Sequence, residues 1–306
     1  MPVMSGRPPV PLALLKAMRP KQWIKNLLVF AGFVFTMNEQ WRPFTPLMWE
    51  LLARSAGAFW LFSLLSSSIY LLNDTLDVEK DREHPVKRNR PIASGVLSPR
   101  LAVAVALFLI PACIGLGYWL SPPFAAVAGG YVLMQFAYIL ALKQVVLIDV
   151  FVLAIGFVMR AVSGAMVIGA VISPWLYTVT LLGALFLGLC KRRNELVLLE
   201  GNAGQHRKIL ELYTPSLLDS LTSVGASATI MAYSLYTFTS PHMPANNLMM
   251  LTIPFVIFGI FRYMFLAHAH NAGGSPEDVF LRDRPLIVTI LLWIVTTASI
   301  LTLRRS

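Results

Sequence analysis

The sequence predicts an all-α integral membrane protein, with about nine transmembrane helices around a central cavity that is capped by cytoplasmic polar loops. Hydrophobic residues make up 57% of the 306 positions and charged residues only 13%, whereas a soluble domain carries roughly 25% charged residues. The apolar stretches are too long for barrel strands, which need only about 10 residues to cross a bilayer. A helical bundle in a membrane is therefore expected.

Nine stretches are long and apolar enough to span, and together they predict one transmembrane domain over residues 1–306. The first is short and starts with the amphipathic, aromatic and cationic segment 19–26, which is expected at the membrane surface. Short turns such as 121–123 and 172–174 separate the third span from the fourth and the fifth from the sixth. The expected spans are 23–38, 50–73, 98–119, 122–142, 145–169, 174–194, 217–239, 247–267 and 285–303.

The distribution of Lys and Arg predicts the orientation of these spans. Nineteen of the 25 cations lie in the N-terminal segment and in alternate connections, or at their edges. The positive-inside rule makes that side cytoplasmic, with the N-terminus inside and the C-terminus outside. A net charge of +10 would attract anionic substrates or lipid head groups. Nucleic-acid binding is not expected, because the cations are juxtamembrane and alternate with acids.

The most informative polar segment, 73–91, directly follows the second span. On a helix, Asp74, Asp77 and Asp81 fall within about 60° of one another. Three carboxylates on one face at the membrane edge predict a bound cation, and oxygen ligands of this kind suit Mg²⁺ bridging to a substrate diphosphate. The alternative is a solvated helix end whose acids pair with nearby Lys and Arg.

Two further groups of charges lie near the same predicted side. Lys191 and Glu195 are four residues apart at the end of the sixth span and share a helix face; the alternative is an ordinary positive flank. Asp149 and Arg160 lie on one face of the fifth span, about 16 Å apart. Charges at this depth face a polar cavity or pair with neighbouring helices, and both interpretations stay open.

Two cationic segments are candidates for holding phosphates. Lys21 and Lys25 are four residues apart, as are Gln22 and Asn26, and the amides suggest hydrogen bonds to a substrate rather than a plain electrostatic anchor. Prolines after His84 and Arg90 interrupt the helix that carries the aspartates. The loop 87–90 can then fold over a phosphate, although a flexible basic loop fits these residues equally well.

The pattern Asn73-Asp74-x-x-Asp77-x-x-x-Asp81, together with nine spans and cytoplasmic polar loops, resembles the UbiA-type membrane prenyltransferase superfamily over nearly the whole chain. Segments 19–26, 74–95 and 191–196 resemble the branch that makes polyprenyl-phosphoryl-5-phosphoribose. One departure agrees with that branch, because prenyl-transferring members carry a second aspartate-rich motif after the sixth span. Residues 191–216 here contain Glu195, Glu200 and Glu211 but no Asp.

The resemblance implies transfer of 5-phosphoribose from phosphoribosyl diphosphate (PRPP) to a polyprenyl phosphate of the decaprenyl type, with release of diphosphate, in a pathway of cell-envelope biosynthesis. It implies Mg²⁺ on Asp74, Asp77 and Asp81. Asp77, Asp81, Lys191 and Glu195 are the expected catalytic residues. The expected substrate-binding residues are Lys21, Lys25, Asn26, Asn73, Lys87, Arg90, Asp149 and Arg160.

Two other functions stay open at this point. A prenyltransferase acting on an aromatic or lipid acceptor would share the fold and the first metal motif. A transporter of anionic lipids would place functional charges deep in the bilayer and polar loops on both sides, and the one-sided charge distribution counts against it. The bilayer is an expected partner in every case. A homo-oligomer is compatible with the sequence, which does not fix the number of copies.

Overall fold

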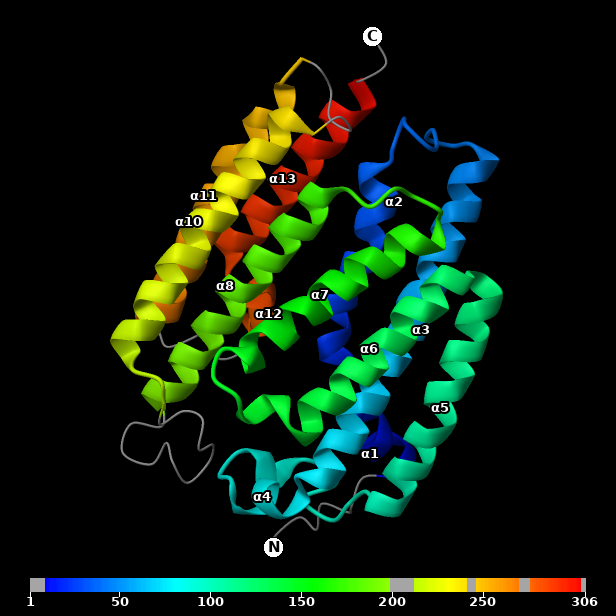
Figure 1. Cartoon of the computed structure of the whole chain (residues 1–306), viewed down its shortest axis with the longest axis vertical. Coiled ribbons are helices and arrows are strands. Elements are labelled where there is room, and N and C mark those ends of the chain that lie inside the picture. The colour runs from blue at the N-terminus through cyan, green and yellow to red at the C-terminus, as the bar shows by residue number, and fades with distance from the viewer. Residues whose placement is uncertain (1–8, 199–211, 241–245, 270–275, 304–306) are drawn as a thin grey trace, which may run out of the picture.

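The protein is a bundle of long helices, and the described residues contain no β-strand beyond one isolated bridge (Figure 1). The computed structural model describes residues 9–198, 212–240, 246–269 and 276–303. The elements in chain order are α1 (Val10–Ala17), η1 (Pro20–Phe30), α2 (Ala31–Phe35), α3 (Pro46–Leu76), α4 (Val78–Glu83), η2 (Lys87–Asn89), α5 (Pro99–Leu120), α6 (Pro122–Leu140), η3 (Leu142–Gln144), α7 (Ile148–Val167), α8 (Pro174–Leu198), α10 (Pro215–Thr239), η5 (Leu248–Thr252), α11 (Ile253–Ala269), α12 (Pro276–Arg282) and α13 (Arg284–Leu303).

Helical segments occupy all nine predicted spans, and the all-helical membrane class is confirmed. By length and composition, seven helical segments within the described residues could cross a membrane: α3, α5, α6, α7, α8, η5 with α11, and α13. The other two predicted spans are η1 with α2, where the helix type changes at residue 31, and α10, which has 25 residues.

Proline marks the start of many of these helices. α3, α5, α6, α8, α10 and α12 each begin with Pro at the first position, where the missing N–H costs no hydrogen bond and the fixed φ suits a helix. Thr45 and Thr214 precede two of these prolines, and their side chains accept from the backbone N–H of Met48 and Leu217. Such caps contribute about 1 kcal/mol each.

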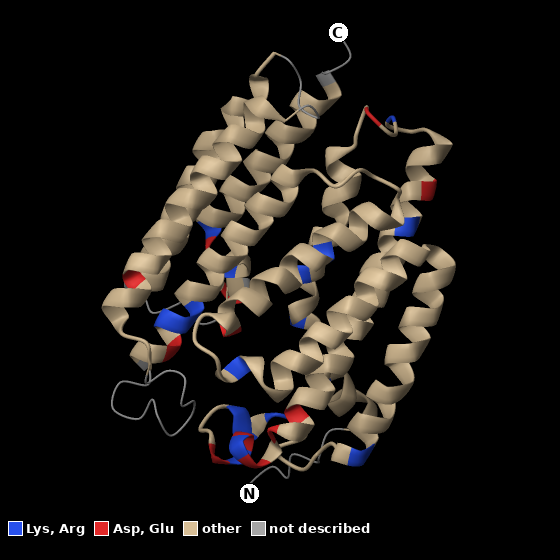
Figure 2. Ribbon diagram, viewed as in Figure 1, with Lys and Arg blue, Asp and Glu red and all other residues tan. Residues whose placement is uncertain are grey.

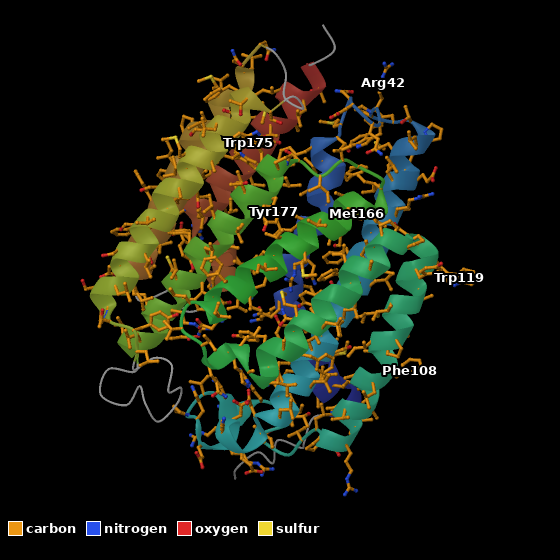
Figure 3. All side chains as sticks on the ribbon, viewed as in Figure 1. Arg42, Phe108, Trp119, Met166, Trp175 and Tyr177 are labelled. Carbon is orange, nitrogen blue, oxygen red and sulfur yellow. The ribbon has the colours of Figure 1, made fainter. Side chains whose placement is uncertain are left out.

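Consecutive long helices pack side by side, from α3 with α5 through α6, α7 and α8 to α10, while α11 packs with α13 (Figure 1). Large apolar side chains cover the outside of the bundle. Phe108 and Trp119 on α5 project outward and are 71% and 91% exposed (Figure 3). In water such a surface would be unfavourable, so its natural surroundings are the hydrocarbon of a membrane.

The segment η1 departs from the predicted geometry. It is a 3₁₀-helix of 11 residues, although such runs rarely exceed four residues. Its backbone lies directly against α7, because a Cβ on Gly164 would be only 1.8 Å from the carbonyl oxygen of Val29. Glycine at position 164 thus permits this approach, and close packing against α7 accompanies the unusual helix.

The helix type changes which side chains of this segment share a face. With three residues per turn, side chains three apart are aligned, so Lys21 and Lys25, and likewise Gln22 and Asn26, are not aligned as they would be on an α-helix. Lys25 instead donates to Gln22, three residues earlier. Asn26 is turned into the bundle and is 1% exposed.

Candidate active site

Charged residues gather at one end of the bundle, around α4 and the neighbouring helix ends, while the opposite end carries few of them (Figure 2). The charged end is the one at which α3 stops and α4 begins. It contains two groups of polar side chains, the aspartates of the 73–91 segment and a cluster around Arg192, and a third group around Arg160 is buried inside the bundle.

Asp74 and Asp81 converge on a shared positive group. Nη1 of Arg90 donates to Oδ1 of Asp74 at 3.0 Å and to Oδ2 of Asp81 at 2.6 Å. Arg19 also donates to Oδ1 of Asp74, at 2.5 Å. The two carboxylates are only 3% and 5% exposed. Two of the three aspartates expected on one face thus share a positive group, and that group is an arginine, as the alternative of acids paired with nearby Lys and Arg describes.

Arg19 reaches Asp74 from an unusual backbone conformation. Its φ of 55° and ψ of 62° are left-handed, which costs a non-glycine residue about 1 kcal/mol or more. Its guanidinium also lies 4.8 Å from the ring centre of Tyr70. The chain thus turns sharply between α1 and η1, and the arginine at this turn is directed to the acids.

Asp77 has a different partner from the other two aspartates. Nζ of Lys143 in η3 donates to its two carboxylate oxygens at 2.9 and 3.0 Å. Helix angles account for the difference, since Asp74 and Asp81 are only about 20° apart around the axis and Asp77 is about 40–60° from them. Within the described residues, no three His, Cys, Asp or Glu side chains are grouped closely enough to hold a metal.

The chemistry of this site nevertheless fits a magnesium ion. Mg²⁺ in proteins takes one or two carboxylates and completes its shell with water and substrate phosphates. Asp74 and Asp81 provide two buried carboxylates around a position that Arg90 neutralises. Burial raises the pKa of the Asp81 carboxyl above its usual range, and Arg90 opposes that rise. The carboxyl of Asp81 thus needs a cation nearby to stay ionised.

The second cluster is centred on Arg192, which is 2% exposed. Nε of Arg192 donates to Oδ2 of Asp149 at 2.6 Å, and Nη1 donates to Glu195. The hydroxyl of Tyr213 donates to Oδ1 of Asp149 at 3.0 Å and accepts from the backbone N–H of Leu147 at 2.7 Å. Burial raises the pKa of Tyr213 to about 12, so its hydroxyl is protonated and donates at neutral pH.

A short stretch of chain connects the first two groups. Lys143, which binds Asp77, lies in the same connection as Leu147, which binds Tyr213. Leu147 is four positions after Lys143 in the sequence, and its φ is positive at 66°. Asp149 follows in the first turn of α7. Since each residue adds at most about 3.6 Å, the acidic motif and the Arg192 cluster are neighbours.

Arg160 and Asn26 form a third, fully buried network inside the bundle. Nε of Arg160 donates to Oδ1 of Asn26 at 2.7 Å, and Nη2 donates to the hydroxyl of Tyr131 at 3.1 Å. The amide of Asn26 donates to Ser63 at 2.9 Å. Three aromatic rings lie within 5.5 Å of the guanidinium, one of them on Phe62. These contacts join η1, α3, α6 and α7.

The predicted same-face arrangement of Asp149 and Arg160 does not make them partners. Each is bonded to another helix, so the alternative of structural pairs with neighbouring helices matches their contacts. Among the other predicted residues, Lys21 is exposed, while Asn73, Lys87 and Lys191 are partly exposed at the charged end.

Sequence reasoning missed four partners of the predicted acids, which are Arg19, Lys143, Arg192 and Tyr213. It also missed Tyr131, which is a polar partner of Arg160. Only the position of Arg192 inside a polar cluster at a helix end could have signalled its importance. Glu200 and Glu211, considered in the connection after α8, lie outside the described residues.

Comparison with known proteins identifies the family. The model of the UbiA prenyltransferase family matches residues 27–272. The chain is 37% identical to a decaprenyl-phosphate phosphoribosyltransferase of Mycolicibacterium smegmatis, over 94% of this chain and 91% of the relative. It is also 37% identical to the protein of that name from Corynebacterium glutamicum, over 94% of this chain and 87% of the relative.

A solved structure has the same fold. The UbiA homolog from Archaeoglobus fulgidus bound to DMAPP and Mg²⁺ superposes with a TM-score of 0.71 at 16% identity, over 94% of this chain and 99% of that one. At this identity the likeness concerns the fold alone. The family model and the relatives, which extend over most of the sequence, lead to one conclusion: the chain belongs to the UbiA prenyltransferase family.

Proposed function

We propose that the protein transfers 5-phosphoribose from PRPP to a polyprenyl phosphate of the decaprenyl type and releases diphosphate. The observation that carries this proposal is the 36–37% identity to decaprenyl-phosphate phosphoribosyltransferases over nearly the whole chain. The acidic and basic residues gathered at one end of the bundle support it, because both substrates are anionic and one of them is a membrane lipid.

The reaction forms a bond between an oxygen of the acceptor phosphate and C1 of the ribose, while the bond from C1 to the diphosphate oxygen breaks. The acceptor oxygen is already anionic, so no general base is needed. What the protein must supply is a position for the two reactants and stabilisation of the charge that develops on the leaving diphosphate.

Asp74 and Asp81 would hold the magnesium ion, which supplies Lewis-acid stabilisation of the diphosphate when bound. Asp77 is one helical turn from both and is a further candidate ligand. Arg90 and Arg19, which pair with these acids, are suited to hold donor phosphates. Asn73, Lys87 and Lys191 line the same end and are proposed to contact the donor.

The remaining predicted residues take distinct roles in this proposal. Lys21 and Lys25 lie in the first six residues of η1 and are suited to the acceptor phosphate. Glu195 is 27% exposed and could bind ribose hydroxyls. Asp149, Arg160 and Asn26 are enclosed by protein partners, so we assign them to positioning the helices that carry the site.

We also propose that the charged end of the bundle faces the cytoplasm and that the protein resides in the cell membrane. The excess of Lys and Arg at that end supports this orientation. PRPP is a water-soluble anion, and the polyprenyl chain is confined to the bilayer. A site at this end of the bundle would be accessible to PRPP from the water and to the polyprenyl phosphate from the bilayer.

The test is a transfer assay in membranes that contain the expressed protein, with labelled PRPP, decaprenyl phosphate and Mg²⁺. We expect lipid-soluble label that disappears with EDTA and falls at least a hundredfold in Asp74→Asn and Asp77→Asn. Glu79→Gln is the matched control, because Glu79 lies on the same segment but its side chain is 77% exposed and paired with Arg82. It should keep normal activity.

One result would contradict the proposed reaction, and another would contradict the role proposed for Asp77. Transfer from a labelled prenyl diphosphate without any transfer from PRPP would identify a prenyltransferase that acts on an aromatic or lipid acceptor. Near-normal phosphoribosyl transfer by Asp77→Asn would exclude Asp77 from the metal site while leaving the reaction itself in place.

A further inference from the structure

The C-terminal half of the bundle contains an apolar cavity of about 230 Å³ that is partly open to the surroundings and is not lined by any of the polar groups described above. It lies between α8, α10, α11, α12 and α13. Its wall is almost entirely hydrocarbon and aromatic rings, with Thr229 and Thr289 as its hydroxyl-bearing residues besides Tyr263. A cavity of this chemistry inside a membrane protein suits a hydrocarbon chain rather than a polar molecule.

Glycines create the space. Gly183 on α8 and Gly259 on α11 both face the cavity. A Cβ at Gly183 would meet Thr229 at 3.6 Å, and one at Gly259 would meet Leu286 at 3.8 Å. These are ordinary van der Waals distances, so neither glycine is required for close helix contact. Larger side chains at these positions would fill the cavity instead.

Two walls of the cavity touch the segment that carries the proposed acceptor-binding lysines. Phe280 on α12 stacks on Tyr263 with ring centres 5.7 Å apart, and α12 packs against η1. Trp293 on α13 lies 6.5 Å from Phe35 of α2, which continues η1. The helices that line the cavity therefore lie beside η1 and α2.

We infer that this cavity receives the distal part of the polyprenyl chain of the acceptor substrate, and that it makes the enzyme favour long acceptors. The inference rests on the proposed function. A phosphate held by the lysines at the start of η1 leaves the chain running along η1 toward α12 and the cavity. A chain of isoprene units is flexible and apolar, as this narrow space between aromatic walls requires.

The experiment compares decaprenyl phosphate with geranyl phosphate as acceptors for Gly259→Leu and Gly183→Leu in the full-length protein. We expect the KM for decaprenyl phosphate to rise roughly tenfold, because the added side chain excludes a few carbons of the chain from a buried apolar site. The KM for PRPP and the rate with geranyl phosphate should stay unchanged. Leucine also suits a helix better than glycine, so folding should not suffer.

Gly115→Leu is the matched control, since Gly115 on α5 is exposed and no atom lies within 4 Å of a Cβ there. It should leave both acceptors unaffected. An unchanged KM for decaprenyl phosphate in both cavity variants would overturn the inference and leave the cavity to a bilayer lipid. Equal losses with both acceptors in both cavity variants, with the control active, would also overturn it.

The wild-type protein separates this inference from the proposed function. Failure of the wild type to transfer label from PRPP to either acceptor would refute the proposed function itself. Transfer by the wild type, with no effect of acceptor length in the cavity variants, would refute only the assignment of the cavity.

Discussion

Replacing Arg192 by methionine should destabilise the protein more than replacing its partner Asp149 by asparagine. The two side chains form an ion pair of 2.6 Å between Nε and Oδ2, with 2% and 0% of their surfaces exposed. Removing one partner of a buried pair leaves the other as an uncompensated charge, and this typically costs about 3–5 kcal/mol.

The two substitutions differ in what they leave behind. Arg192→Met removes the positive partner of Asp149, whose carboxylate keeps the hydrogen bond from the hydroxyl of Tyr213. We therefore expect the full cost of about 3–5 kcal/mol. Asp149→Asn keeps the contact with Tyr213, and Arg192 stays paired with Glu195. Its cost should approach that of one charge-assisted hydrogen bond, about 1.5–3 kcal/mol.

Thermal unfolding of the purified protein in detergent measures the difference. At about 2–4 °C per kcal/mol, Arg192→Met should lower Tm by about 6–20 °C, and Asp149→Asn by about 3–12 °C. The double variant Asp149→Leu, Arg192→Met removes both charges and should recover much of the loss, because a buried pair can often be replaced by apolar residues. A melting temperature for Arg192→Met equal to that of the wild type, or equal losses in the two single variants, would refute this reasoning.

Three other perturbations test separate parts of the structure. Gly164→Ala should unfold the protein or lower its yield severely, because the new Cβ would be 1.8 Å from the carbonyl oxygen of Val29; expression followed by gel filtration checks this. Asp283→Ala should cost about 1 kcal/mol in a thermal melt, since Asp283 caps α13 by accepting from the N–H of Leu286 at 2.9 Å. A hydrogen bond from an arginine of α11 lowers the pKa of Asp283 in the folded protein. The stabilisation that Asp283 contributes should therefore be complete above the ordinary aspartate pKa, and it should be lost as the pH falls through the lowered pKa of Asp283. Arg90→Met should weaken phosphoribosyl transfer at least tenfold while strengthening Mg²⁺ binding, because the two aspartates that Arg90 bridges would lose a competing cation; titration with Mg²⁺ and the KM for PRPP measure the two effects.

The helical spans were predictable because bilayer thickness sets the length of an apolar helix. The 3₁₀ geometry of η1 was not predictable, since segment 20–30 has no local feature that forbids an α-helix after Pro20. Its backbone lies against that of α7, across more than 130 residues of sequence, at Gly164. Such a contact is set by tertiary packing rather than by local propensity.

The acidic residues of the candidate site could be predicted from the sequence, but the residues that they contact could not. Helix angles alone place Asp74 and Asp81 within about 20° of each other, and both contact the same guanidinium nitrogen of Arg90. Arg19 and Lys143 lie 55 and 66 residues from the acids that they bind. No periodicity links residues so distant, so only the fold can identify these pairs.

The pairing of acids with cations at this site has a consequence for how the proposed substrates bind. Mg²⁺ alone would have to take Asp74 and Asp81 from Arg90, leaving the guanidinium beside a divalent cation. A diphosphate alone would have to take Arg90 and Arg19 from the carboxylates, leaving two buried acids without a cation. Binding of Mg²⁺ alone and binding of diphosphate alone are both unfavourable, because each leaves like charges together in a poorly solvated site. If both arrived together, Asp74 and Asp81 would hold the metal ion, and Arg90 and Arg19 would hold the phosphates. On the proposed function, the pairing of these acids with arginines would therefore favour simultaneous binding of metal and diphosphate.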